Sequence, residues 1–285
     1  MPQIKIITDS TADLGQELLT ANDVGMIPLL VQFDQESYRD GIDIDSPRLF
    51  QIVEAKKQLP KTASPSPAVF QEAFAEAAKD GSQVIYIGIS SKLSAAQQNA
   101  RIAASAFPEG QVYVVDSYNL STGIGLQVLN ACDMARAGKS AEEIVRTLEQ
   151  DRSKVRTTFM IDTMEYLYKG GRCNSLQALM GSLLHIRPII AVVNGAMIVD
   201  GKVRGSRQRA IEYQLDKFAQ HVREGLVRPD RVFVTHTSPQ EDVEYAKKRV
   251  REIFPEAKSV LDTRAGSVIG SHCGPGTLGI LYVLK

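Results

Sequence analysis

The first half of the chain alternates short apolar runs with amphipathic helical segments, and this alternation constrains the fold most. Four runs rich in apolar and β-branched residues indicate buried strands: 4–7, 26–33, 84–89 and 112–115. Between two of these runs, Ser66-Pro67 starts a helical pattern that ends at Asp80-Gly81. Parallel strands need a crossover connection, so this order predicts a mostly parallel sheet flanked by helices.

A capping box, Ser140 to Glu143, starts another helix, and the polar run 151–156 after it is the expected domain junction. The 285 residues suit two ordinary domains. We therefore expect an N-terminal α/β domain over 1–155 and a C-terminal α/β domain over 156–285.

The second half contains the signals of a mixed sheet with helices. The expected elements are a helix at 175–184, an antiparallel hairpin (189–193 and 197–199) around Asn194-Gly195, a helix at 206–224, a strand at 232–235, a helix capped at Ser238-Pro239, and a strand at 280–284.

Charge and cysteine usage exclude several classes of protein. Lys and Arg total 33 and so do Asp and Glu, so no overall attraction to nucleic acid is expected. Cys132, Cys173 and Cys273 are far apart and form no disulfide or zinc pattern. The chain also lacks an apolar run of roughly 18 residues and the apolar core of a signal peptide. These features predict a cytoplasmic protein.

Hydroxyl and acidic clusters follow several of the expected strands. They are Thr8 to Thr11, Ser90-Ser91, Asp116-Ser117 and Thr235 to Thr237. Each cluster by itself is explained more simply as a helix cap. Ligands of parallel sheets bind beyond the carboxyl ends of the strands, however, so the recurrence favours a shared site.

The segments 62–67 and 90–96 each lead into a helix, where backbone N–H groups and hydroxyls can donate to an anion. Because no phosphate-binding glycine motif is present, a carboxylate is favoured over a polyphosphate. No metal-ligand spacing is present either, so neither a metal nor a cofactor is expected. Two glycine-punctuated loops hold Arg172 and His272, although a lone histidine is more often structural and an arginine more often an ion-pair partner.

In this order the segments resemble the DegV family of fatty-acid-binding proteins, which serve as lipid-presenting subunits of bacterial fatty acid kinase. The resemblance extends over the whole chain and rests on 8–11, 62–66, 90–94, 116–117, 170–172, 187–188 and 272–276. It implies a two-domain α/β protein with a fatty acid between the domains, its carboxylate held by hydroxyls and its tail in an apolar tunnel.

The resemblance assigns the carboxylate to the hydroxyls of Thr62 and Ser94, supported by His272. Supporting positions around the site are Ser10, Ser64, Ser91, Asp116 and Arg172. The chain departs from the family pattern at Ala95-Ala96, where Gly-Thr is common, at Cys273, where Thr is usual, and at Arg187, where a lysine is usual.

The function implied is that of a noncatalytic carrier. It binds a long-chain fatty acid and presents the carboxylate to a separate ATP-dependent kinase, which forms an acyl phosphate. Two alternatives stay open: a stand-alone α/β enzyme acting on a small carboxylated or phosphorylated metabolite, and a regulatory sensor without a kinase partner.

A basic segment, 202–209, stands out in this neutral chain. We expect Arg204, Arg207 and Arg209 to lie on an exposed face that contacts the kinase or, transiently, a membrane surface. A solvated helix start explains the same charges equally well.

Overall fold

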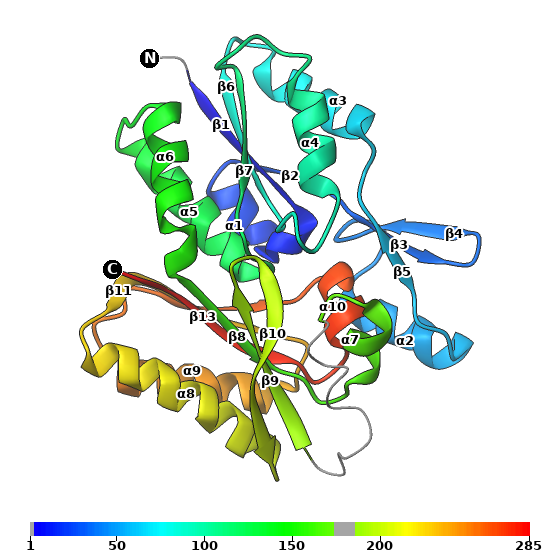
Figure 1. The fold of residues 1–285 in the computed structure, drawn as a ribbon, viewed down its shortest axis with the longest axis vertical. Helices are drawn as coiled ribbons and strands as arrows, with labels where there is room; N and C mark the ends of the chain where they lie inside the picture. The colour runs from blue at the N-terminus through cyan, green and yellow to red at the C-terminus, as the bar shows by residue number, and fades with distance from the viewer. Residues whose placement is uncertain (1–2, 174–185) are drawn as a thin grey trace.

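The first half of the chain forms the predicted parallel sheet, in the strand order β2-β1-β6-β7 (Figure 1). The computed structural model of the protein describes residues 3–173 and 186–285. The strands are β1 (Ile4–Asp9), β2 (Val24–Ile27), β6 (Gln83–Gly88) and β7 (Val112–Asp116). The helices around this sheet are α1 (Gly15–Ala21), α3 (Pro67–Ala78), α4 (Ala96–Ala104), α5 (Thr122–Arg136) and α6 (Ala141–Asp151). Helices α3 and α4 lie on one side of the sheet, and α5 and α6 on the other.

The single strand predicted over 26–33 was wrong. Pro28 separates β2 from β3 (Leu30–Phe33), which belongs to a different sheet. Proline fixes its own backbone and has no N–H to donate, so it interrupts a ladder even within an apolar run.

A small antiparallel sheet, β4-β3-β5, extends from the parallel sheet. It contains β3, β4 (Glu36–Arg39) and β5 (Lys61–Ala63), and it is connected through α2 (Ser46–Lys56). Its core includes Phe33, Leu49 and Val268, the last from the far end of the chain. This packing brings β5 close to α10 (Ser267–Cys273).

The second half forms a mixed sheet in the order β10-β9-β8-β13-β11-β12. Only β11 and β12 run parallel to each other. The strands are β8 (Val155–Met160), β9 (Ile186–Val193), β10 (Ala196–Arg204), β11 (Val227–His236), β12 (Val260–Arg264) and β13 (Leu278–Leu284). The remaining helices are α7 (Glu165–Gly170), α8 (Arg207–Arg223) and α9 (Gln240–Ile253), and the short 3₁₀ helices are η1 (Ser10–Ala12) and η2 (Arg152–Lys154).

The predicted hairpin is confirmed as β9 and β10, and its turn residues Asn194 and Gly195 have φ of 49° and 82°. Two positive φ values are what a tight hairpin turn requires. Strand β11 is longer than predicted, because a register shift between Val227 and Val232 lets a polar segment join the strand. The helix expected at 175–184 lies outside the described residues.

Helix starts were predicted with mixed success. The capping box at Ser140 and Glu143 is confirmed, as is the long helix α8 with Ser206 at its N-cap. Ser66 holds the N-cap position of α3, but its hydroxyl makes no capping hydrogen bond. The cap predicted at Ser238 was wrong, because its hydroxyl donates to the Thr277 carbonyl (2.9 Å) and α9 starts only at residue 240.

Helix α5 lies between the two large sheets and joins them into one structure. A Cβ on its Gly123 would lie 2.6 Å from Thr157 Oγ1 on β8, so glycine permits this close approach. The chain thus has the expected two-domain α/β architecture. The exact boundary at 155/156 stays a prediction, since one apolar cluster contains Val115, Phe159 and Leu281.

Candidate functional site

The three residues that the resemblance assigns to the carboxylate line one cavity of about 200 Å³. Thr62 comes from β5, Ser94 from the loop before α4, and His272 from the last turn of α10. Much of the remaining wall is apolar: Leu29, Ile89, Leu93, Leu120, Met197, Val268 and Ile269. The cavity therefore combines a small polar group with a hydrophobic surface.

Thr62 and His272 are directly hydrogen-bonded, with Oγ1 and Nε2 2.8 Å apart. Burial, followed by the charge of Arg172, lowers the pKa of His272 to about 4, so the imidazole is neutral at pH 7. Nδ1 is buried without a hydrogen-bond partner in the described part of the chain. A proton on Nδ1 would bury an unpaired donor, which favours the tautomer protonated at Nε2. His272 then donates to Thr62, whose own O–H is free to donate to an anion.

Ser94 has a similar arrangement. Its Oγ accepts a hydrogen bond from the backbone N–H of Ala96 at 3.2 Å, so its hydroxyl hydrogen is available to a ligand. Ala95 occupies the N-cap of α4 and also lines the cavity. At 95–96, where Gly-Thr is common in the family, this chain therefore supplies backbone N–H groups but no side-chain hydroxyl.

Helix α10 is anchored by two carboxylates that the sequence analysis did not single out. Asp13 Oδ1 accepts from the N–H of Gly266 (2.8 Å), and Asp40 Oδ1 accepts from the N–H of Ser267 (2.7 Å). Burial raises the pKa of both carboxyl groups. No local pattern could have linked them to this helix, because 227 residues separate Asp40 from Ser267.

Gly170 lies against the imidazole of His272. A Cβ at this position would lie 2.4 Å from Nδ1, so any side chain here would displace the imidazole. The backbone at this glycine can therefore approach His272 closely.

Comparison with known proteins gives the family. The sequence model of the DegV family, described as uncharacterised proteins, matches residues 3–285. This chain belongs to the DegV family. It is 36% identical to a DegV domain-containing protein of Deinococcus radiodurans over 97% of both chains, and 32% identical to Protein DegV of Bacillus subtilis over 99% of both chains.

Solved DegV structures share the whole fold. A fatty-acid-binding DegV family protein from Thermus thermophilus is 33% identical and superposes with a TM-score of 0.92, covering 99% of this chain and all of that one. DegV of Bacillus subtilis, described as a fatty acid binding protein, is 30% identical with a TM-score of 0.89 and full coverage of both chains.

Arg172 and Cys273 also line the DegV cavity. Arg172 is exposed, and its Nη1 donates to the Gly170 carbonyl at 2.6 Å. Burial, with a smaller effect of Asp13, raises the pKa of Cys273 to about 12. The thiol is therefore neutral and does not repel an anion.

The other supporting residues have structural partners. Ser64 lines the cavity, but its hydroxyl donates to the Pro65 carbonyl (3.0 Å) and accepts from the Asn99 amide (3.2 Å). The remaining three, Ser10, Ser91 and Asp116, do not line this cavity. Ser10 Oγ accepts from the N–H of Leu29 (3.1 Å), and the Asp116 carboxylate accepts from the N–H of Ser91 (3.3 Å). The strand-end clusters therefore stabilise loops. Of the three clusters on the parallel sheet, only the one with Ser90 and Ser91 belongs to a loop that lines this cavity, and it does so through Ser94.

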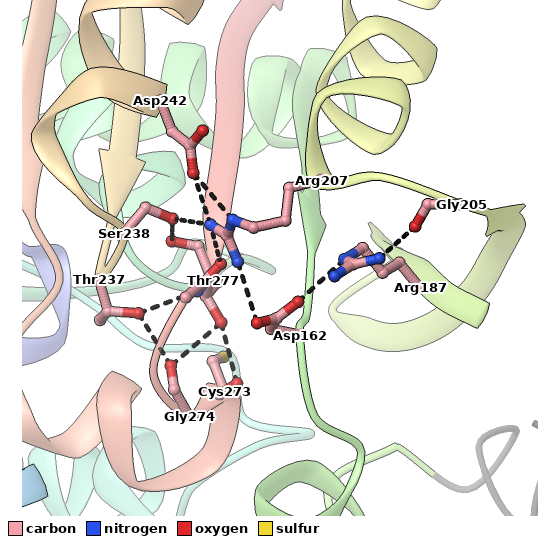
Figure 2. A network of polar contacts seen from close by, with 11 residues as sticks. Asp162, Arg187, Gly205, Arg207, Thr237, Ser238, Asp242, Cys273, Gly274 and Thr277 are labelled. Carbon is pink, nitrogen blue, oxygen red and sulfur yellow. Dashed lines mark hydrogen bonds and ion pairs between the residues drawn. The ribbon is translucent and has the colours of Figure 1, made fainter. Parts of the chain in front are cut away.

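The three arginines of the basic segment separate into two groups. Arg204 and Arg209 are exposed. Arg207 is half-buried in the network of Figure 2, where it donates to Asp242 (2.9 Å) and Ser238 (2.9 Å) and pairs with Asp162 (3.2 Å). Its guanidinium therefore contacts other residues of this protein, whereas the sequence analysis expected Arg207 on an exposed face.

The same network contains Arg187, which pairs with Asp162 at 2.9 Å and donates to the Gly205 carbonyl. Within residues 3–173 and 186–285, no group of His, Cys, Asp and Glu side chains is arranged to hold a metal ion. In the same residues, no helix is both long and apolar enough to cross a membrane.

Proposed function

We propose that this DegV protein binds one long-chain fatty acid, with the carboxylate at Thr62, Ser94 and His272. The observation that supports this most is the convergence of two hydroxyls and a neutral imidazole at one cavity with otherwise mainly apolar walls. The fatty-acid binding described for two related structures at 33% and 30% identity supports the same ligand class.

Neutral donors suit a carboxylate that must stay reactive. A carboxylate removed from water needs several hydrogen bonds to offset its lost hydration. Each bond from the Thr62 or Ser94 hydroxyl to the charged group contributes roughly 1.5 to 3 kcal/mol. Because neither hydroxyl is charged, neither forms an ion pair that would lower the nucleophilicity of the carboxylate.

The cavity described above receives the head end of the ligand. Its volume of about 200 Å³ is below the roughly 300 Å³ at which ligand pockets commonly begin. We therefore assign the carboxylate and the adjoining methylenes to it, with Leu29, Ile89 and Met197 contacting the chain.

The protein then presents this carboxylate to a separate kinase in the cytoplasm, with transient membrane contact for lipid exchange. In this reaction a carboxylate oxygen attacks the γ-phosphorus of ATP bound to the kinase. The bond between the γ-phosphorus and the bridging oxygen breaks, ADP leaves, and the acyl phosphate stays on the carrier. The carrier contributes position and a dry environment, and is not itself the catalyst.

Native mass spectrometry of protein expressed in bacteria, combined with lipid extraction, tests the binding step. We expect one fatty acid per chain, lost on delipidation and regained from added palmitate. Recovery of lipid-free protein only, with no uptake, would contradict the proposal.

The kinase step is tested by pull-down from a bacterial extract followed by addition of ATP. We expect capture of an ATP-dependent partner and formation of acyl phosphate only when both proteins are present. Turnover of a water-soluble metabolite by this chain alone would instead establish a stand-alone enzyme.

A further inference from the structure

A second and larger cleft, of about 490 Å³, lies beside the mixed sheet and shares no lining residue with the cavity above. It lies where β9 separates from β8, since these strands pair only over 158–160 and 189–191. The tip of the β9-β10 hairpin is held to the first domain, where Ser90 Oγ donates to the Gly195 carbonyl at 2.8 Å. Helix α8 contributes the side chains of Lys217 and His221.

The cleft is positively charged. Its lining contains three cationic side chains, Arg152, Arg156 and Lys217, and one carboxylate, Asp200, which leaves a net charge of +2. Asp200 is already paired with Lys217. Among the described residues, no carboxylate lies within 4.0 Å of either arginine, although both are half-buried. The two arginines therefore have no protein counter-ion within this distance.

Most hydrogen-bond donors of these arginines are unused. Arg152 donates from Nη1 to the Asp116 carbonyl (3.3 Å), and Arg156 donates from Nη1 to the Ser153 carbonyl (2.8 Å). A guanidinium has five N–H donors in a planar fork that matches phosphate oxygens. Both residues line the cleft and therefore keep donors available for an anion bound there.

Tyr118 fixes the position of the Arg152 guanidinium. The Arg152 guanidinium lies 3.8 Å from the centre of the Tyr118 ring, and stacking of this kind pre-organises an arginine. Tyr118 has a left-handed φ of 52°, held by a hydrogen bond from its N–H to Asp116 Oδ1 at 3.0 Å. The backbone therefore adopts an uncommon conformation at the residue that supports the arginine.

We propose that this cleft binds a small phosphate monoester. The net charge of +2 matches the charge of about −2 on a phosphate group near neutral pH. The volume lies within the range of ligand pockets, roughly 300 to 1,000 Å³, and Val192 and Val193 supply apolar surface for an organic group. The inference does not depend on fatty-acid binding.

Isothermal titration with inorganic phosphate, ribose 5-phosphate and AMP tests the site, with ribose and adenosine as neutral controls. We expect saturable binding of the monoesters and none of the neutral compounds. Arg152→Ala and Arg156→Ala should each weaken binding about tenfold, the loss of one charge-assisted hydrogen bond. Fatty-acid occupancy should not change in either variant.

Lys154→Ala is the matched control, because Lys154 loses the same charge nearby but pairs with Asp151 (2.8 Å) and does not line the cleft. It should bind as the wild type does. Equal weakening by Lys154→Ala, binding of a dicarboxylate in preference to the monoesters, or no saturable binding at millimolar concentrations would each overturn the proposal.

The protonation of His221 gives an independent signal. Its Nδ1 is 2.7 Å from the Tyr282 hydroxyl. Burial, followed by the charge of Arg156, lowers the pKa of His221. Glu224 opposes this effect, and Lys217 adds to it. A bound anion offsets Arg156 and Lys217, so phosphate should raise the pKa of His221 measured by NMR. A pKa unchanged at saturating phosphate would contradict binding in this cleft.

Discussion

His272 shows at the scale of single residues how burial prepares a binding group. Its imidazole is neutral because burial disfavours the charged form, and its bond to Thr62 leaves a hydroxyl hydrogen for the ligand. A protonated histidine would pair with the carboxylate more strongly, but would also reduce its nucleophilicity. The neutral group therefore suits the proposed role of a carrier that presents a bound carboxylate to a kinase.

The low pKa of His272 predicts a specific dependence of stability on pH. Its ordinary pKa of 6.5 applies to the unfolded chain, whereas its pKa in the folded protein is about 4. The unfolded state therefore binds a proton first, so stability is fully present above 6.5 and is lost as the pH falls towards 4. Relative to His272→Gln, the lipid-free wild type should lose up to about 3 kcal/mol over this range. Urea unfolding at several pH values measures the difference, and parallel curves for the two proteins would contradict it.

Gly170 gives a second prediction at this scale. In Gly170→Ala the new Cβ would meet His272 Nδ1 at 2.4 Å, so the imidazole must move away from Thr62. We expect weaker fatty-acid retention and a loss of roughly 1 to 3 kcal/mol in the free energy of unfolding. In a His272→Ala background the same change should cost clearly less, because the clash is gone. An equal cost in both backgrounds would show that Gly170 acts independently of His272.

Helix α10 is the element on which the site depends. It has only seven residues, and such a short helix is not stable without tertiary contacts. Its N-terminal N–H groups are bound by Asp13 and Asp40, and its last turn holds His272. The two carboxylates thus position the histidine through the helix.

Asp40→Asn tests this anchoring. Burial raises the pKa of Asp40 above its ordinary value of 3.8, so the carboxyl group binds a proton more readily in the folded protein than in the unfolded chain. The associated stability is present at low pH and is lost as the pH rises above 3.8 through the raised pKa. Asparagine keeps the acceptor for Ser267, so the wild type should lose stability relative to Asp40→Asn as the pH rises.

Asp43→Asn is the control with the opposite sign, because Arg39 lowers the pKa of Asp43 to about 2. The same slope for both variants in urea unfolding would contradict the assignment.

Periodicity predicted elements well where local physics decides. Strands β1, β6 and β7, the hairpin turn at Asn194 and the capping box at Ser140 all follow from local patterns. The prediction over 26–33 failed because it disregarded Pro28, and the cap at Ser238 failed because a distant carbonyl competes for the hydroxyl.

Local sequence patterns predicted less of the candidate site than of the fold. Thr62 and His272 are 210 residues apart, so their contact followed from the family resemblance and not from spacing. The anchors Asp13 and Asp40 and the occupied guanidinium of Arg207 depend on tertiary contacts that no local pattern encodes.

At the scale of the whole molecule, the two large sheets are joined through α5, and the small sheet brings β5 to α10. The cavity is therefore built from segments of both halves and depends on their packing. Surface residues away from it, such as Arg204 and Arg209, can contact a partner without altering the pocket.

Replacing both Arg204 and Arg209 by Ala tests the proposed partner surface. Exposed charges mainly affect association rates, so we expect slower acyl-phosphate formation, a weaker dependence on salt, and unchanged fatty-acid occupancy. Arg207→Ala should behave differently and lower the free energy of unfolding, because it breaks the contacts with Asp162 and Asp242. Identical kinetics of wild type and double variant across a salt series would remove this surface from the account.

The central claim is that Thr62 and Ser94 hold one carboxylate together. A double-mutant cycle of Thr62→Val and Ser94→Ala, measured by titration of delipidated protein with a fluorescent fatty acid, tests it most directly. Each single change should cost roughly 1.5 to 3 kcal/mol of binding free energy, and the double variant should lose less than the sum, because both hydroxyls bind the same group. Thr62→Ser, which keeps the hydroxyl, should bind nearly as the wild type does. Effects near zero at both positions in folded protein would show that the carboxylate is held elsewhere.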